Sequence, residues 1–385
     1  MLKIKPIASK FCTGAVLLGA FFITSLDARA QINIDGIWIS KTEVLSLPNS
    51  GKNWEVIYKD AGNLSGMTAN VSDQNSNHDI HTMAAALVCV RVGEFCEDAR
   101  NGVVSAIGTE YGGRGRWLAV GRNLTAYVIA ADLLDLRTDN DPESKGSRTQ
   151  TWLEGFLTKN LAHNNTGEPH PLIPFNSGSN ASAQEAAVYA AIGAYLNDSD
   201  ALDRVWDAFR TYACDPSAPD HEEINIQQGI AHGWAHDDEQ ACAINPLGTT
   251  KGIPDGLPGN GDVYRIDGAI INDIRRGDEY QWPPVYTQYP WVGMEGLIPV
   301  ALFLHRAGYP AFEVADQAVL RASEFLWYLR EETGDIRWFD KQRAAEIKHL
   351  VNVIYGRNFP VQRPVGSGRL IGYTDWTHGK RDAIY

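Results

Sequence analysis

The sequence predicts an all-α fold, an α/α toroid (an incomplete α/α barrel) of paired antiparallel helices with long loops between some of them. Apolar residues recur at helical spacing along most of the chain, and neither a hairpin series nor a strand–helix–strand alternation is visible. Amphipathic helices of ordinary length bury their apolar faces by packing on one another. Because the chain has no strict repeat period, we expect a closed ring of helix pairs instead of a regular solenoid.

Helical periodicity is clearest in residues 78–92, whose apolar positions share one face. Residues 181–196 are rich in Ala and follow a suitable N-cap at Ser179 or Asn180. The expected helices are residues 53–61, 78–92, 96–108, 124–136, 150–161, 181–196, 201–212, 291–307, 312–329 and 341–354.

Two long segments interrupt this pattern, residues 215–276 and 357–385. The first is rich in Gly, Pro, Asn and Asp and also contains His and Trp residues. Loops of this length in a compact domain are usually either functional or disordered. The aromatic and histidine content of the first favours a functional loop beside an active site.

The N-terminus has the three parts of a secretory signal peptide. Lysines within residues 1–10 form a basic start, an apolar run follows at residues 15–23, and small residues end it at residues 28–30. The apolar run is shorter than the roughly 20 residues that a membrane span needs. We therefore expect residues 1–30 to be a signal peptide, cleaved near Ala30, and the protein to be secreted or periplasmic.

The mature chain, residues 31–385, is expected to be a single domain, since no linker or change in composition divides it. We expect a monomer that makes no membrane contact after cleavage. The 34 basic and 47 acidic residues of the full chain give a net charge of −13, which disfavours binding to nucleic acids and anionic membranes. A polyanionic ligand would therefore need a local basic cleft.

Four cysteines follow the signal peptide, and an even number in an exported protein indicates disulfides. Three pairings are possible. The economical one joins Cys89 to Cys96 and Cys214 to Cys242, because each bond then closes a local loop.

The segment at residues 267–308 is the richest in side chains that could bind or transform an acidic sugar. Arginine binds a carboxylate through two parallel hydrogen bonds, tyrosine can act as an acid or a base, and aromatic rings stack on sugars. The alternative is an aromatic packing loop with surface arginines. The candidates in this segment are Arg275, Arg276, Tyr280, Trp282, Tyr286, Tyr289 and Trp291.

A second group lies in the long loop, where His232 and His236 flank Trp234. Histidines four residues apart could bind a metal on a helix, but Gly233 disfavours a helix and no third ligand follows. We expect no metal and no cofactor. One of the histidines could instead assist a tyrosine or bind a carboxylate, the alternative being an exposed loop.

Two further candidates precede or begin helices. Asn176 lies just before the Ala-rich helix, where its amide could donate to a carboxylate with help from the helix N-terminus. Asn180 is more simply a cap. Arg122 could face a cleft or could pair with a carboxylate, and we favour the structural interpretation.

Several of these motifs together resemble the alginate lyase superfamily. The stretch YPWVGMEGLIPVALFLHRAG at residues 289–308 looks like that family's helix after the catalytic tyrosine, which places the tyrosine at Tyr289. Asn176 looks like the first residue of its carboxylate-binding motif. Other similar segments are residues 121–134, 273–277 and 376–378.

The chain departs from the family in two places. Where the family has Asn-His, this chain has Asn176 followed by Ser. The missing histidine could be replaced by His232 or His236. The gap between Arg276 and Tyr289 is also longer, so that Tyr280 and Tyr286 remain candidates for the base.

The resemblance implies a polysaccharide lyase that cleaves a 1,4-linked polyuronate, either alginate (polymannuronate) or glucuronan, by β-elimination. Its partner would be an acidic polysaccharide. Tyr289 would act as base and acid, while Asn176, Arg276 and His232 or His236 would neutralise the uronate carboxylate or assist the tyrosine. The substrate-binding residues would be Arg122, Trp234, Arg275, Tyr280, Trp282 and Tyr286.

Two other functions fit the same sequence. A glycoside hydrolase on a similar toroid needs two carboxylates across the scissile bond, and Asp237, Asp238, Glu239, Asp267 and Asp273 are available. A periplasmic protein that binds oligosaccharides without turnover is the other alternative.

Overall fold

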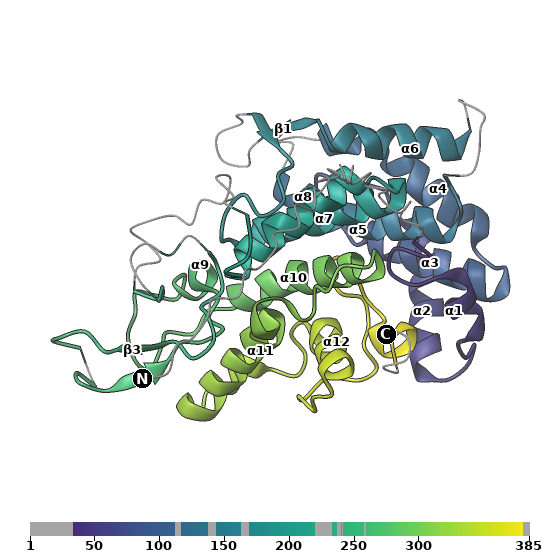
Figure 1. Ribbon diagram of the computed structural model, residues 1–385. Coiled ribbons are helices and arrows are strands. Elements are labelled where there is room, and N and C mark those ends of the chain that lie inside the picture. Colours follow the sequence, from purple (N-terminus) through teal and green to yellow (C-terminus); the bar gives the residue numbers. More distant parts are fainter. Residues whose placement is uncertain are drawn as a thin grey trace, which may run out of the picture. The chain divides into compact units, whose positions relative to one another are not determined.

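Four largely buried helices form the interior of the protein in the computed structural model: α3 (His78–Val92), α5 (Trp117–Leu133), α7 (Asn180–Leu196) and α10 (Tyr289–Arg306). In this order each helix packs on the next, so that α7 lies between α5 and α10 (Figure 1). Their residues are mostly Ala, Val, Leu and Ile, which suits helices that are covered on several sides.

The structure describes residues 34–111, 117–137, 144–162, 169–219, 233–236, 240, 242–257 and 259–379. From Ile32 onwards these belong to one compact unit. Helical residues predominate, at 55% against 5% for strands, which confirms the predicted all-α class. The outer helices are α1 (Lys41–Ser46), α2 (Lys52–Asn63), α4 (Cys96–Ala106), α6 (Lys145–Phe156), α8 (Ser199–Tyr212), α9 (Ile271–Ile274), α11 (Val314–Thr333), α12 (Ala345–Tyr355) and α13 (Thr374–Thr377), with 3-10 turns η1 (Leu64–Gly66), η2 (Thr109–Tyr111) and η3 (Ile336–Phe339).

The two helices whose bounds differ most from the prediction are α5 and α6. The helix expected at residues 124–136 begins at Trp117 and ends at Leu133, and Gly121 inside it packs against the backbone of Glu185. The helix expected at residues 150–161 begins at Lys145, where the Ser144 side chain accepts from the Ser147 amide as an N-cap. It ends at Phe156.

Two short antiparallel hairpins accompany the helices. β1 (Asn160–Ala162) pairs with β2 (Pro169–Pro171) and places Leu161 opposite His170. β3 (Thr250–Gly252) pairs with β4 (Val263–Arg265) inside the segment that the sequence predicted to be irregular. The first hairpin brings His170 next to Glu185 of α7.

Both predicted disulfides are confirmed. Cys89 and Cys96 join the end of α3 to the start of α4, and Cys214 and Cys242 join the segment after α8 to the loop that returns towards α9. The predicted signal peptide lies outside the described residues. Among the helices that are described, none combines the length and the apolar character of a membrane span.

The helices α7 and α10 approach each other closely at Gly296. A Cβ atom added there would overlap the backbone of Ala183 and would lie 2.5 Å from the amide nitrogen of Gln184. A hydrogen bond also joins the two helices here, because the side-chain amide of Gln184 in α7 donates to the backbone carbonyl of Val292 in α10 at 3.3 Å. Only glycine allows the two helices to approach this closely.

We expect Gly296→Ala to destabilise the protein by roughly 1–3 kcal/mol or more, because the added methyl group forces α7 and α10 apart. Gly155→Ala in α6 is the matched control: nothing lies within 4 Å of its added Cβ, and Ala is favoured in a helix by roughly 0.5–1 kcal/mol. Urea unfolding of both variants measures the difference. Equal stability of the two variants would contradict the close-packing argument.

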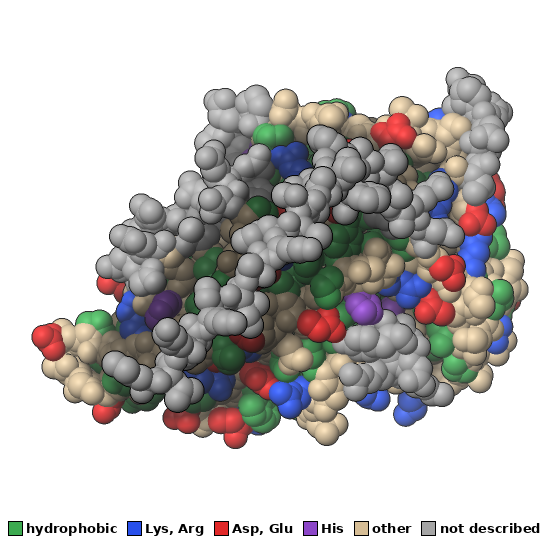
Figure 2. Space-filling model, in the orientation of Figure 1, with side chains coloured by type: hydrophobic (Ala, Val, Ile, Leu, Met, Phe, Trp, Pro, Cys, Tyr) green, Lys and Arg blue, Asp and Glu red, His purple; other side chains and the backbone are tan. Residues whose placement is uncertain are grey.

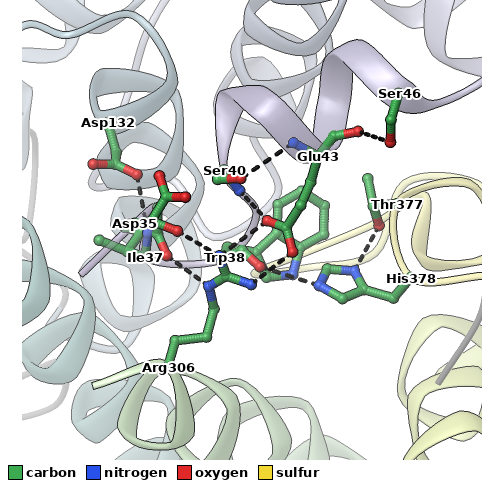
Figure 3. Close-up of polar contacts among 11 residues, drawn as sticks. Asp35, Ile37, Trp38, Ser40, Glu43, Ser46, Asp132, Arg306, Thr377 and His378 are labelled. Carbon is green, nitrogen blue, oxygen red and sulfur yellow. Dashed lines mark hydrogen bonds and ion pairs between the residues drawn. The ribbon is translucent and has the colours of Figure 1, made fainter. Parts of the chain in front are cut away.

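The segment that precedes α1 is held by contacts from both α10 and the C-terminal part of the chain (Figure 3). The Arg306 side chain donates to the Gly36 carbonyl at 2.6 Å and pairs with Glu43 at 3.0 Å. On the other side, Nε2 of His378 lies 3.1 Å from the Trp38 carbonyl oxygen. These contacts anchor the first described residues on helices that are distant in sequence.

His378 is fully buried, and burial lowers its pKa to about 3. An unfolded histidine titrates near 6.5, so that between pH 6.5 and pH 3 the unfolded chain binds a proton that the folded one does not. The contribution of the neutral ring to stability is therefore present above pH 6.5 and is lost as the pH falls.

We expect the stability difference between the wild type and His378→Asn to shrink by about 2 kcal/mol when the pH is lowered from 7.5 to 5. Urea unfolding of both proteins at the two pH values measures it. A difference that does not change with pH would show that His378 titrates normally in the folded protein.

Candidate functional site

Some of the predicted site residues lie where α7 and α10 begin. Asp273 in α9 is fully buried and accepts from the Asn180 backbone amide at 3.1 Å and from its side chain at 2.8 Å. Its other oxygen lies against Gly293 of α10. Burial raises the Asp273 pKa to about 7, against the hydrogen bonds from Asn180. Asp273 therefore fixes the segment that carries Arg275 and Arg276 beside the starts of both helices.

Arg276 contacts the ring of Tyr289, the first residue of α10. The guanidinium carbon lies 4.5 Å from the ring centroid, Arg276 is exposed and Tyr289 is half-buried. A guanidinium at this distance from a ring centroid makes a cation–π contact with the aromatic ring. The sequence placed these two residues in one site, and the structure brings them into contact.

Arg122 of α5 interacts electrostatically with the same tyrosine. Burial and the charge of Arg369 lower the Arg122 pKa to about 10, while the charges of Glu295 and Tyr289 act in the opposite direction. Its side chain donates to Gln184 at 3.3 Å and to Gln74 at 3.0 Å. We had expected Arg122 to pair with a carboxylate, but its hydrogen bonds to described residues go to the neutral side-chain amides of Gln184 and Gln74.

Asn176 lies before α7 in a small polar group that also contains His170 of β2. Its Oδ1 accepts from the Ser182 hydroxyl at 2.8 Å, and its Nδ2 lies 3.4 Å from Nε2 of His170. The His170 ring stacks on Trp117 at 4.7 Å between centroids. A histidine is thus present beside Asn176, as the family resemblance requires, but it comes from the β1–β2 hairpin.

Sequence analysis missed His170 because it is six residues away from Asn176 and belongs to no motif. It also missed Glu185, which lies on the Ala-rich helix. Nε2 of His170 is 3.1 Å from Oε1 of Glu185, which is fully buried. The one available signal was an acidic residue within an otherwise apolar helix.

Burial raises the Glu185 pKa to about 7, against the hydrogen bond from His170. An unfolded glutamate titrates near 4.3, so this group makes the protein less stable as the pH rises from about 4 through 7. We expect Glu185→Gln, which cannot ionise, to gain stability relative to the wild type over the same range, by a few kcal/mol at most. Urea unfolding at pH 5 and pH 8.5 tests the sign, and a relative loss at pH 8.5 would refute it.

Several predicted binding residues lie in packed surroundings. Trp234 is 1% exposed and Tyr280 3% exposed, and their rings meet edge to face at 4.9 Å. The Tyr280 hydroxyl donates to the Lys251 carbonyl at 2.8 Å, and burial raises its pKa to about 12. Neither ring offers a face for a sugar, and Tyr280 is a poor candidate for the base.

Two other aromatic candidates also have protein partners. Trp282 stacks on Tyr264 at 4.0 Å between ring centroids. Tyr286 is half-buried against Trp338, and the Arg337 guanidinium carbon lies 4.7 Å from its ring. A binding role for both stays a prediction.

Some of the remaining predicted site residues lie within the described part of the chain and others lie outside it. His236 is exposed, and its backbone amide donates to Gln240. Arg275 donates to the Asn272 side chain at 2.8 Å. Asp267 pairs with Arg321 at 2.8 Å. The predictions that lie outside the described residues are those for His232, Asp237, Asp238 and Glu239.

An additional charged group adjoins Arg122. Glu295 of α10 lies 3.2 Å from Nε of Arg369 and is nearly buried. Glu346 of α12 is also nearly buried, and burial together with the charge of Glu295 raises its pKa to about 8. Sequence analysis named none of these three residues, although Glu295 interrupts an apolar run.

Comparison with known proteins adds no relative: no family model and no curated protein matches the chain.

Proposed function

We propose that this protein is a polysaccharide lyase of the alginate lyase type, which cleaves a 1,4-linked polyuronate by β-elimination on an α/α toroid. The observation that carries the proposal is the contact between Arg276 and Tyr289, 4.5 Å from guanidinium carbon to ring centroid, beside the helix that follows Asn176. Tyr289 could act as the base, and Arg276 beside it could bind the carboxylate of the substrate.

The carboxylate of the bound uronate must be neutralised before its C5 proton can leave. Asn176 suits this role because Ser182 donates to its Oδ1, which leaves the amide N–H groups as donors. One of these groups faces His170, and the other has no hydrogen bond to a described residue and would in our proposal bind the carboxylate. Arg276 supplies the positive charge.

The elimination then needs one group to move a proton. Tyr289 takes the proton from C5, the electron pair of that bond forms the C4–C5 double bond, and the C4–O4 bond breaks. In syn geometry the same tyrosine returns the proton to O4. His170 contacts Asn176 and Glu185 and in this proposal positions the Asn176 amide. The sequence had instead predicted that His232 or His236 neutralises the carboxylate or assists the tyrosine. None of these steps requires a metal or a cofactor.

The two disulfides support export, since such bonds persist in oxidising compartments. Together with the N-terminal sequence they favour a secreted or periplasmic protein, which we propose to act as a monomer on an extracellular polymer. The assay described below distinguishes alginate from glucuronan as the substrate.

A glycoside hydrolase is less well supported by the described carboxylates. Asp267 is bound to Arg321 and Asp273 to Asn180, so that both already serve the fold. A hydrolase needs one carboxylate free to protonate a leaving group and a second to act as base or nucleophile.

We expect the purified protein to produce ultraviolet absorbance of an unsaturated uronate on polymannuronate, polyguluronate or glucuronan, and Tyr289→Phe to reduce the rate by about 10² to 10⁴-fold. Tyr58→Phe is the control, since Tyr58 is exposed and bonds Glu94. Loss of activity in Tyr286→Phe instead would move the base to that residue. Reducing ends without absorbance would indicate a hydrolase, and binding without either product a binding protein.

A further inference from the structure

A pocket of about 240 Å³ opens between the N-terminal end of α3 and the segment that precedes α13. Its walls include Gln74, Asn77 and Asn123 on one side and Gly368 and Arg369 on the other, with Arg122 between them. Among the residues that line it in the described part of the chain, two are arginines and none is acidic. The volume suits one sugar ring better than a large ligand.

The positive charge around this pocket exceeds the negative charge. Arg122 donates to the neutral amides of Gln184 and Gln74. Arg369 pairs with Glu295, and the second acid nearby, Glu346, has its pKa raised to about 8 by burial and by the charge of Glu295. Burial also raises the pKa of Glu295, so that the ionisation of both carboxyls is disfavoured.

The polar wall of the pocket is built to hold its shape. The Asn123 side chain donates to the carbonyls of Val71 at 3.1 Å and Asp73 at 2.8 Å, which fixes the loop that carries Gln74. Asn77 is the N-cap of α3 and makes no capping bond with its side chain to any described residue. The positive end of the α3 dipole adds to the field of the two arginines.

The overall charge makes this local field significant. The chain has a net charge of −13, and on the face drawn in Figure 2 acidic and basic side chains are interspersed. A pocket with two arginines and no lining acid is therefore a place where a polyanion can approach an otherwise acidic protein. Arg122 links it to the proposed active site, since its charge interacts with both Arg369 and Tyr289.

We propose that this pocket is a second carboxylate subsite, in which Arg122 and Arg369 bind the uronate of a neighbouring sugar while another uronate of the same polymer lies at Tyr289. The inference rests on the proposed function and adds to it that the enzyme recognises at least two acidic sugars, so that oligomers bind better than monomers. Arg369 is a binding residue here and has no part in the proton transfer.

The test uses Tyr289→Phe, in which turnover is slowed, and calorimetric titration with the tetramers and the monomers of mannuronate, guluronate and glucuronate. In this background Arg369→Gln should weaken tetramer binding about tenfold and should leave monomer binding unchanged. Arg369→Lys, which keeps a charge beside Glu295, should lose less affinity. Arg357→Gln is the matched control, since Arg357 is similarly exposed and also paired with a glutamate.

With active enzyme, Arg369→Gln should raise KM with little change in kcat, because the lost contact is made equally in the ground state and the transition state. Equal losses for tetramer and monomer, or a fall in kcat alone, would overturn the proposal. Unchanged tetramer affinity in Arg369→Gln would do so as well. If tetramer binding depends on Arg369 but the protein produces no unsaturated uronate, the pocket is a carboxylate-binding site and the proposed lyase activity is refuted.

Discussion

The close approach of α7 to α10 at Gly296 is the constraint on which the rest of the structure depends. Because no side chain separates the helices there, the N-terminal end of α10, with Tyr289, lies beside the start of α7, with Asn176 before it. The buried Asp273 adds α9 to the same place through its bonds to Asn180. The segment that carries Arg276 and Tyr289 thus presents a guanidinium and a phenol near the start of α7, about a hundred residues earlier in the chain, where Asn176 presents an amide. A change in the α7–α10 distance would disturb this arrangement.

Burial then determines the charges of this region. Asp273, Glu185 and Glu346 all have pKa values raised by burial to between about 7 and 8, so that the acids that shape the site carry less negative charge than their number implies. The arginines around them keep their charge. An acidic protein can in this way present a locally positive site, which is what recognition of a polyuronate would demand. Because their pKa values are raised, the ionisation of these acids costs stability as the pH rises.

The sequence predicted the core helices and both disulfides well, because these depend on local pattern. Apolar spacing placed α3 at its observed bounds, and loop closure paired Cys89 with Cys96. His170 and Glu185 could not be predicted, since only the pairing of β1 with β2 brings the histidine to α7. Trp234 and Tyr280 looked like sugar-binding residues by type, yet they are buried against each other.

By itself, the sequence determined that the protein is helical, that its cysteines pair locally, and that Arg276 and Tyr289 belong to one segment rich in chemistry. These follow from periodicity and from short separations along the chain. Only the tertiary structure decided which histidine accompanies Asn176, and that Arg122 and Arg369 share a pocket with no lining acid. Such contacts join residues that are far apart in the chain, and their positions depend on how closely whole helices pack rather than on any local pattern.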